Sequence, residues 1–234
     1  MNDHHRIKQN NIFKRRIFTA ILFLLAFAVW TAAVMTLDVS PIGPNGSRVG
    51  LSGMNGFFAR VIGVDQDLYI VTDYLGLIPI AVAFFFGTVG LIKWIKRKRI
   101  TRVDRDILAL GGLYLTVIAF YVLFELVVIN RRPVLIDGQL EASYPSSTTM
   151  LVLSVMPAAA LQRRARIKHK PLGTALSLLI TAFTAFMLIG RLMSGVHWVS
   201  DIVGGVLLST GLSLAYRAVF YYFIDITTTS ETAQ

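Results

Sequence analysis

The residues most able to do chemistry lie in two short polar stretches of an otherwise apolar chain. His197 and Asp201 stand four residues apart, which in a helix places two side chains on one face. A carboxylate in that position can hold one imidazole nitrogen and leave the other free to act as a nucleophile. Taken singly, His197 is also typical of an interfacial side chain at a membrane surface.

Three arginines accompany this pair: Arg191 in the same stretch, and Arg131 and Arg132 in the earlier one. A guanidinium group binds phosphate oxygens through two parallel hydrogen bonds. Paired arginines at the end of a span can also be simple anchors. Because all three are expected at the same surface as the histidine, together they predict a site for a phosphate group.

A run of hydroxyl side chains, Ser146, Ser147 and Thr148, follows Pro145 and opens an apolar segment. These residues are typical helix N-caps. A helix N-terminus with free N–H groups also binds anions, so the run is a second candidate phosphate contact. Glu125, inside an apolar segment, is a further functional candidate because an ionisable group at membrane depth is costly unless it is paired or wetted.

The elements that must position these residues are long apolar segments. The chain of 234 residues is 55% hydrophobic and 15% charged, with a mean hydropathy of +0.64, whereas a soluble domain carries about a quarter charged residues. A helix needs about 20 apolar residues to cross a bilayer. We therefore expect an all-α membrane protein, a bundle of six transmembrane helices forming one integral membrane domain over residues 1–234. The expected spans are Ile17–Leu37, Tyr69–Ile95, Ile107–Asn130, Ser147–Gln162, Leu172–Ile189 and Val199–Tyr222.

Charge predicts the orientation of this bundle. Of the 23 lysines and arginines, 17 lie before the first span or in the connections after the second and fourth spans. The positive-inside rule makes that side cytoplasmic. Residues 1–16 and 223–234 are then cytoplasmic, in a multi-pass protein of the cell membrane, and the site faces outward. The net charge of +10 is thus a topology signal, and we expect no nucleic-acid partner.

The composition also narrows the chemistry. With no cysteine, the chain has neither a Cys-ligated zinc site nor a thiol nucleophile. Nothing on the predicted outer side resembles a carboxylate-rich cluster for Mg²⁺. We therefore expect no metal and no cofactor.

Three motifs that follow one another over residues 107–222 resemble those of a known protein family. An arginine, five residues, a histidine, three residues and an aspartate are present as Arg191, His197 and Asp201, followed by Ile-Val-Gly-Gly. Arg132-Pro133 ends a first motif, and the run from Pro145 to Thr148 is a second. In these motifs the chain resembles the type 2 phosphatidic acid phosphatase superfamily, membrane lipid phosphatases related to vanadium haloperoxidases.

The resemblance implies a role for each matching residue. His197 would be the nucleophile and Asp201 would orient it. Arg132 and Arg191 would grip the phosphate, and Ser146 with the backbone of Ser147 would complete the cradle. The implied fold is a six-helix bundle with an outward-facing site.

Three positions depart from the family pattern. Gly190 replaces the serine that usually leads the third motif. Thr148 replaces a histidine thought to protonate the leaving oxygen. The lysine of the first motif is absent near Glu125, although Arg131 supplies a cation from a different place. Glu125 or Glu141 is a possible substitute acid.

These features predict a hydrolase that removes phosphate from a membrane lipid phosphate or polyprenyl diphosphate through a phosphohistidine. Without the usual acid, a diphosphate is favoured because its leaving group is already stabilised. The alternative is a catalytically weakened relative that binds or transports phospholipid headgroups. Transfer to another acceptor would use the same nucleophile. We expect His197, Arg132, Arg191 and Thr148 to surround one cavity.

Overall fold

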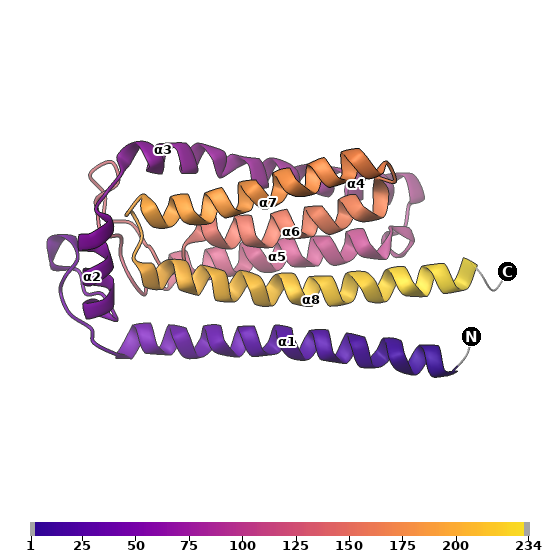
Figure 1. Cartoon of the computed structure of the whole chain (residues 1–234), viewed down its shortest axis with the longest axis horizontal. Coiled ribbons are helices and arrows are strands. Elements are labelled where there is room, and N and C mark those ends of the chain that lie inside the picture. The colour runs from indigo at the N-terminus through magenta and orange to yellow at the C-terminus, as the bar shows by residue number, and fades with distance from the viewer. Residues whose placement is uncertain (1–2, 232–234) are drawn as a thin grey trace.

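The computed structural model describes residues 3–231, which form one bundle of roughly parallel and antiparallel helices (Figure 1). The helix α2 lies across one end of the bundle, and both termini lie at the other. The described residues contain no strand, only three isolated β-bridges. The helices are α1 (Asp3–Thr36), α2 (Ser52–Ile62), α3 (Gln66–Leu75), α4 (Leu77–Arg97), α5 (Arg105–Leu126), α6 (Ser147–Arg166), α7 (Lys170–Met193) and α8 (Val199–Glu231), with short 3₁₀ turns at Pro44–Gly46 and Ile100–Arg102.

Within the described residues, five segments are long and apolar enough to cross a membrane: Gln9–Thr36, Gln66–Arg97, Arg105–Leu126, Lys170–Met193 and Val199–Phe223. The all-α membrane architecture predicted from the sequence is therefore confirmed. The fourth expected span, α6, does not reach that apolarity. It is the central helix, with ten of its 20 residues buried against four of 24 in α7, so its surroundings are mostly protein. A helix shielded from lipid can carry more polar residues.

Several helix ends differ from the predicted spans. The second span is two helices, α3 and α4, which meet at Gly76, where a Cβ would lie 2.9 Å from the Asp73 carbonyl. Because α5 ends at Leu126, Glu125 is exposed in its last turn and not more than a turn below the end of a span, as the sequence suggested. The predicted terminal segments are largely helical, and residues 1–2 and 232–234 lie outside the described residues.

A proline inside α6 fixes its contact with α8. Pro157 has no N–H, so the Leu153 carbonyl has no donor one turn further along its own helix. The Ser213 hydroxyl of α8 donates to that carbonyl at 2.8 Å. The carbonyl group that the proline leaves without a donor in α6 therefore accepts a hydrogen bond from α8.

At the end of the bundle covered by α2, aromatic side chains anchor the long α5–α6 loop. Tyr144 is buried and stacks against Phe27 of α1 with ring centroids 6.3 Å apart. Its hydroxyl lies 2.7 Å from the Thr31 hydroxyl, also in α1. The Trp30 indole donates to the Ser200 carbonyl at 3.0 Å. The first helix therefore holds both the α5–α6 loop and the start of α8.

Candidate active site

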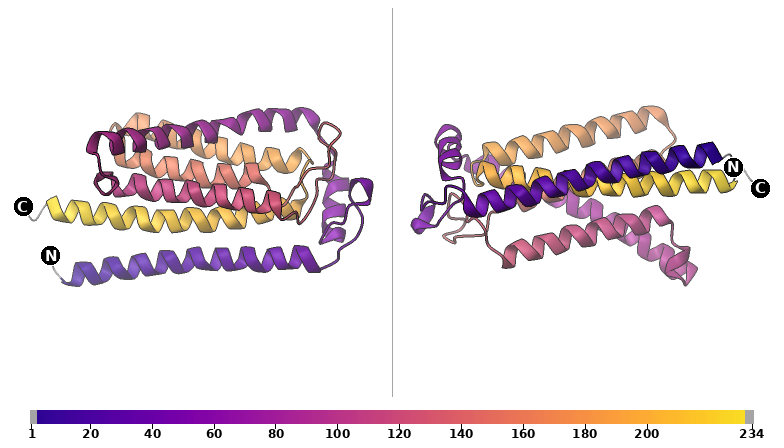
Figure 2. Two further views of the ribbon diagram at one scale, coloured as in Figure 1. Left: turned by 180° about the vertical axis from the view of Figure 1, so that it is seen from behind. Right: turned by 90° about the horizontal axis from the view of Figure 1, so that it is seen from below.

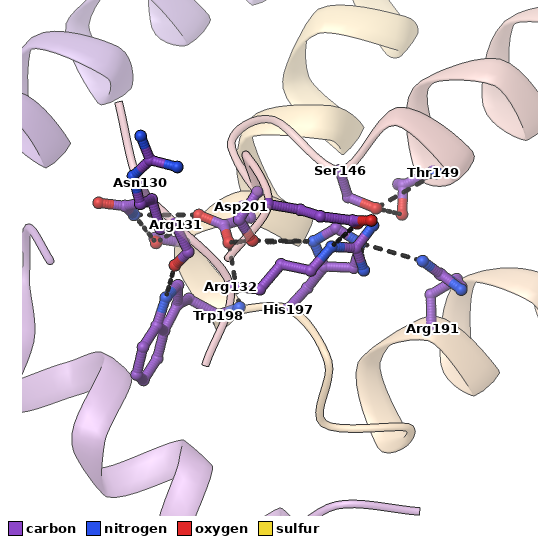
Figure 3. A network of polar contacts seen from close by, with 12 residues as sticks. Asn130, Arg131, Arg132, Ser146, Thr149, Arg191, His197, Trp198 and Asp201 are labelled. Atoms are coloured by element: carbon purple, nitrogen blue, oxygen red, sulfur yellow. Dashed lines mark hydrogen bonds and ion pairs between the residues drawn. The ribbon is translucent and has the colours of Figure 1, made fainter. Parts of the chain in front are cut away.

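Four predicted side chains converge at the end of the bundle that α2 covers (Figure 3). Arg132 comes from the loop between α5 and α6, Arg191 from the last turn of α7, His197 from the short α7–α8 loop, and Asp201 from the first turn of α8. All four are buried. The separation of their sources along the chain means that the helix bundle itself assembles the group.

The Nε2 atom of His197 faces two guanidinium groups. The Nη2 atom of Arg191 lies 3.1 Å from it and the Nη1 atom of Arg132 lies 3.4 Å from it. A guanidinium group can only donate hydrogen bonds, so Nε2 must be the acceptor and carries no proton. The unprotonated nitrogen is thus aimed at the point where the two cations meet.

The other ring nitrogen contacts a serine rather than the aspartate. Ser143 Oγ lies 3.1 Å from Nδ1 of His197 and also donates to the Asp201 carboxylate. The direct distance from Nδ1 to Asp201 Oδ2 is 4.0 Å. Nδ1–H therefore donates to the Ser143 hydroxyl, and this hydroxyl donates to the carboxylate, which fixes the tautomer.

The sequence expectation that His197 and Asp201 share a helix face is not met, because α8 begins at Val199 and His197 precedes it. Instead, the α7–α8 loop turns at Gly195, which has φ +67°. A Cβ there would lie 1.8 Å from the Gly63 carbonyl oxygen. Only glycine allows this close approach, and it sets the direction from which the imidazole enters the site.

Burial and charge keep the imidazole neutral. His197 is buried, and burial together with the nearby Arg132 and Arg191 cations lowers the pKa of its imidazole well below the usual value. A neutral imidazole has a free lone pair at neutral pH. The surroundings thus keep the nucleophile ready for attack on an electrophile that brings negative charge.

The Asp201 carboxylate has a full set of donors. Asn130 Nδ2 donates to it at 3.0 Å, the Trp198 backbone N–H at 3.1 Å and the Ser200 hydroxyl at 3.2 Å. Asn55 of α2 accepts from the Ser200 N–H at 3.1 Å and so holds that residue in place. Because every neighbour of the carboxylate is itself fixed, its orientation toward Ser143 is rigid.

The two arginines are held differently. Arg191 is 1% exposed; Asp73 lies 3.6 Å from its Nη1 atom, and its guanidinium lies 5.3 Å from the Tyr69 ring centroid. Its Nε has no hydrogen-bond partner among the residues that the structure describes. The Nε atom of Arg132 lies 3.0 Å from a Glu141 carboxylate oxygen. A buried guanidinium with spare donors is a site for an anion.

A cavity of about 340 Å³ opens at His197 and Arg132. Ser143 and Ser147 border it, as do Glu125 and Glu141, and aromatic side chains form one wall. The described residues thus place two carboxylates on the lining of the cavity that His197 also borders. Such a cavity can take a phosphate group together with the first part of an apolar chain.

Three predicted site residues do other things in the structure. Arg131 is exposed, donates to the Leu140 carbonyl at 2.8 Å and points away from His197 (Figure 3). Ser146 caps α6, accepting from Thr149 N–H at 3.4 Å. Thr148 lines a neighbouring cavity of about 390 Å³ together with Asp73. The expectation that Thr148 shares the cavity of His197 is therefore not met, because the first turn of α6 directs it toward α3 and α4.

Sequence reasoning missed Ser143, Asn130 and Asn55. Ser143 and Asn130 belong to the same polar stretch as Arg132, but no spacing marks them, because their place depends on how the α5–α6 loop folds back on α8. The backbone bond from Ser143 N–H to the Asn130 carbonyl, at 2.9 Å, closes that loop. Asn55 had no sequence signal at all.

The chain was compared with known families and with solved structures. Residues 132–225 match the family model described as the PAP2 superfamily. Among solved structures, the chain is similar to a transmembrane PAP2-type phosphatidylglycerolphosphate phosphatase from Bacillus subtilis, with 18% identity and a TM-score of 0.54, over 90% of this chain and 96% of that one. No curated protein matches the chain. The matched segment contains Arg132, Ser143, Arg191, His197 and Asp201, so the side chains of the candidate site lie in the part of the chain that matches the PAP2 superfamily.

Proposed function

We propose that the protein is a membrane lipid phosphatase that works through a phosphohistidine on His197. The observation that carries the proposal is the position of the unprotonated Nε2 atom, 3.1 Å from Arg191 and 3.4 Å from Arg132. A phosphate between these groups would meet the nucleophile and its charge stabilisers together.

In the first step, the Nε2 lone pair attacks phosphorus, the bond from phosphorus to the lipid oxygen breaks, and the leaving oxygen takes a proton. The two guanidinium groups move from Nε2 to the phosphate oxygens and stabilise their charge. The positive charge that develops on the ring is stabilised through Nδ1–H, Ser143 and Asp201. In the second step, water attacks phosphorus, the phosphorus–nitrogen bond breaks, and phosphate leaves.

The donor of the leaving-group proton distinguishes possible substrates. Thr148 cannot act as an acid at neutral pH. Glu141 is paired with Arg132, whereas Glu125 borders the cavity and has no ion pair or side-chain hydrogen bond in the described structure. We therefore assign Glu125 as the substitute acid, and we expect a polyprenyl diphosphate to react faster than a phosphate monoester, because its phosphate leaving group needs less protonation.

The composition of the cavity lining also favours a second function. The described cavity lining contains no imidazole besides His197. A catalytically weakened relative that binds or moves phospholipid headgroups would keep the two arginines and need no acid. Absence of phosphate release from every lipid, with headgroup binding retained, would support this alternative.

The orientation follows from charge. The α6–α7 turn and the α4–α5 connection carry basic residues at the end that holds the termini, away from His197 (Figure 1). By the positive-inside rule this end is cytoplasmic, in the cell membrane, and the candidate site faces outward. Because the chain has no cysteine, single Asp137→Cys and Lys98→Cys variants test this with a membrane-impermeant maleimide on intact cells. Labelling at position 98 but not at position 137 would show that the protein has the opposite orientation.

Phosphate release by the purified protein tests the chemistry. The substrates are undecaprenyl diphosphate, phosphatidic acid and phosphatidylglycerol phosphate, with His197→Ala as the control. We expect release from at least one lipid, its loss in the variant by about 10³-fold or more, and an acid-labile label on His197 from ³²P-lipid. Equal or reversed rates on the diphosphate and the monoesters would remove the diphosphate preference, and release that survives in His197→Ala would overturn the mechanism.

A further inference from the structure

A groove far from the candidate site runs between α6, α7 and α8. Its volume is about 650 Å³. Helically spaced rows line it, with Leu153, Pro157 and Leu161 on α6, and Ile180, Ala185 and Leu188 on α7. Along the groove, α7 runs clear of α8 toward the end with the termini (Figure 2, right).

Three of the four hydroxyl side chains that line the groove donate to backbone carbonyls. Thr181 donates to the Ser177 carbonyl at 2.9 Å, Thr184 to the Ile180 carbonyl at 2.7 Å, and Ser213 to the Leu153 carbonyl at 2.8 Å. With their protons committed to backbone, these side chains add little polarity. The groove therefore has the character of an apolar channel along the bundle.

The groove ends at two arginines. Arg164 of α6 and Arg217 of α8 both line it, and Arg164 with Thr181 also lines an adjoining cavity of about 510 Å³. That second cavity is bordered by further cations, Arg163, Lys168 and Lys170. An apolar channel thus opens into a basic cup at the end away from His197.

These cations differ from others at the same end of the bundle. Lys93 and Arg97 pair with Asp104, and Arg166 pairs with Asp106 at 2.8 Å. The five that border the groove and cup form no ion pair with a carboxylate in the described structure. Unpaired positive charge beside an apolar channel is complementary to a molecule with an anionic head and an apolar chain.

We propose that the groove and cup bind an anionic phospholipid, with the phosphate between Arg164 and Arg217 and an acyl chain along α6. From Leu153 to Arg164 the α6 row spans about 16 Å at the helical rise, so the channel takes an extended chain rather than a small ion. The proposal needs neither the phosphatase activity nor the His197 site.

Photolabelling tests the proposal. The full chain in phosphatidylcholine nanodiscs is exposed to a phosphatidylglycerol analogue with a diazirine on its acyl chain, and labelled peptides are mapped. We expect labelling in the residues of α6, α7 and α8 that line the groove. A double variant, Arg164→Gln with Arg217→Gln, should lower that labelling by about tenfold or more.

A matched pair of cations at the same end supplies the control. Lys98 and Arg99 are exposed, lie outside the groove and form no ion pair with a carboxylate in the described structure. Their double change to Gln removes the same charge and should leave the labelling unchanged. An equal fall in both double variants would overturn the site, because general surface charge would then explain binding.

Two further arms separate the possible occupants. Ala185→Trp fills the groove without changing charge and should also reduce labelling; full labelling in this variant would contradict the channel. In the wild-type protein, unlabelled phosphatidylglycerol should compete and glycerol 3-phosphate should not. Competition by glycerol 3-phosphate, or equally strong labelling by a phosphatidylcholine analogue, would overturn an anionic lipid as the occupant.

Discussion

At one end of the bundle, Arg132 and Arg191 are buried and lie within 3.4 Å of an imidazole nitrogen. At the other end, Arg164 and Arg217 are exposed and border an open groove. Burying a guanidinium group removes its hydration, which costs free energy. At the first end, neighbouring side chains hold the two guanidinium groups where a bound anion can replace the lost water. The exposed arginines stay hydrated and can change side-chain conformation. The same side chain therefore serves a rigid site at one end and an adaptable surface at the other.

Changing an arginine at each end should separate these roles. Arg191→Lys keeps the charge but loses the planar fork, so phosphate release should fall by about 10²–10³-fold. Arg99→Lys, at the opposite end, should stay within about twofold. Both rates are measured on the best lipid substrate. A similar loss in both variants would mean that the rigid end is not special.

A pair of glycines tests the rigidity of the site end. Gly195→Ala would place a Cβ 1.8 Å from the Gly63 carbonyl oxygen at a positive φ, so we expect a loss of about 2–3 kcal/mol of stability or a displaced loop. Gly111, in α5 nearer the other end, has open space where a Cβ would lie, with no contacting heavy atom within 4 Å. Gly111→Ala should be neutral or stabilising by up to about 1 kcal/mol. Thermal unfolding in detergent measures both, and equal transitions would argue against a tight α7–α8 loop.

Two buried serines, one in the candidate site and one in the middle of α6, allow the contribution of the site hydroxyl to be measured. Ser143 links His197 to Asp201, whereas Ser154 in α6 is equally buried and its hydroxyl has no partner among the described residues. Ser143→Ala should lower kcat about tenfold with KM nearly unchanged, because the tautomer is no longer fixed while the arginines remain. Ser143→Thr should restore part of the rate, and Ser154→Ala should have none of these effects. A change in KM alone would assign Ser143 to binding.

The smallest expected effect is on pH-dependent stability. The pKa of His197 is lowered by burial and by the two arginines, so between the unfolded pKa of about 6.5 and the lower folded value only the unfolded chain binds a proton. Stability should therefore fall as the pH drops below 6.5, by at most about 1.4 kcal/mol per pH unit. His197→Asn should remove this slope. Asp38, whose pKa is lowered by the Gly53 N–H and the Ser52 hydroxyl, acts at lower pH and does not overlap.

The long helices and the basic end of the bundle could be predicted because apolar length and clustered charge are local properties of the sequence. The convergence of Arg132, Arg191 and His197 was also expected, and the geometry brings them together. Ser143 could not be predicted, because its position between His197 and Asp201 depends on the path of a long loop. The predicted pairing of His197 with Asp201 is present at 4.0 Å, but its hydrogen bonds run through Ser143.

The predictions of the depth of Glu125 and of the cavity that Thr148 lines were wrong for other reasons. Glu125 was misplaced because α5 ends at Leu126 and not at Asn130. Thr148 was misplaced although α6 begins at Ser147 as predicted, because the sequence does not show which neighbours face each side of its first turn. α6 is short and contains Pro157, and its central place in the bundle explains its composition. Helix ends and loops, where the site lies, are therefore the least predictable part of this chain.

The hydrogen bonds that α1 forms with the site loops have a practical consequence. Trp30 and Thr31 hold Ser200 and Tyr144, and Asn55 of α2 holds Ser200, yet none of these three residues belongs to the segment 132–225 that matches the family. A fragment trimmed to the matched segment would contain the reacting groups but lose their scaffold. Co-expressing α1 and α2 as a separate polypeptide is thus the natural way to split this protein, since the partner fragments would have to reassociate for the loops to close.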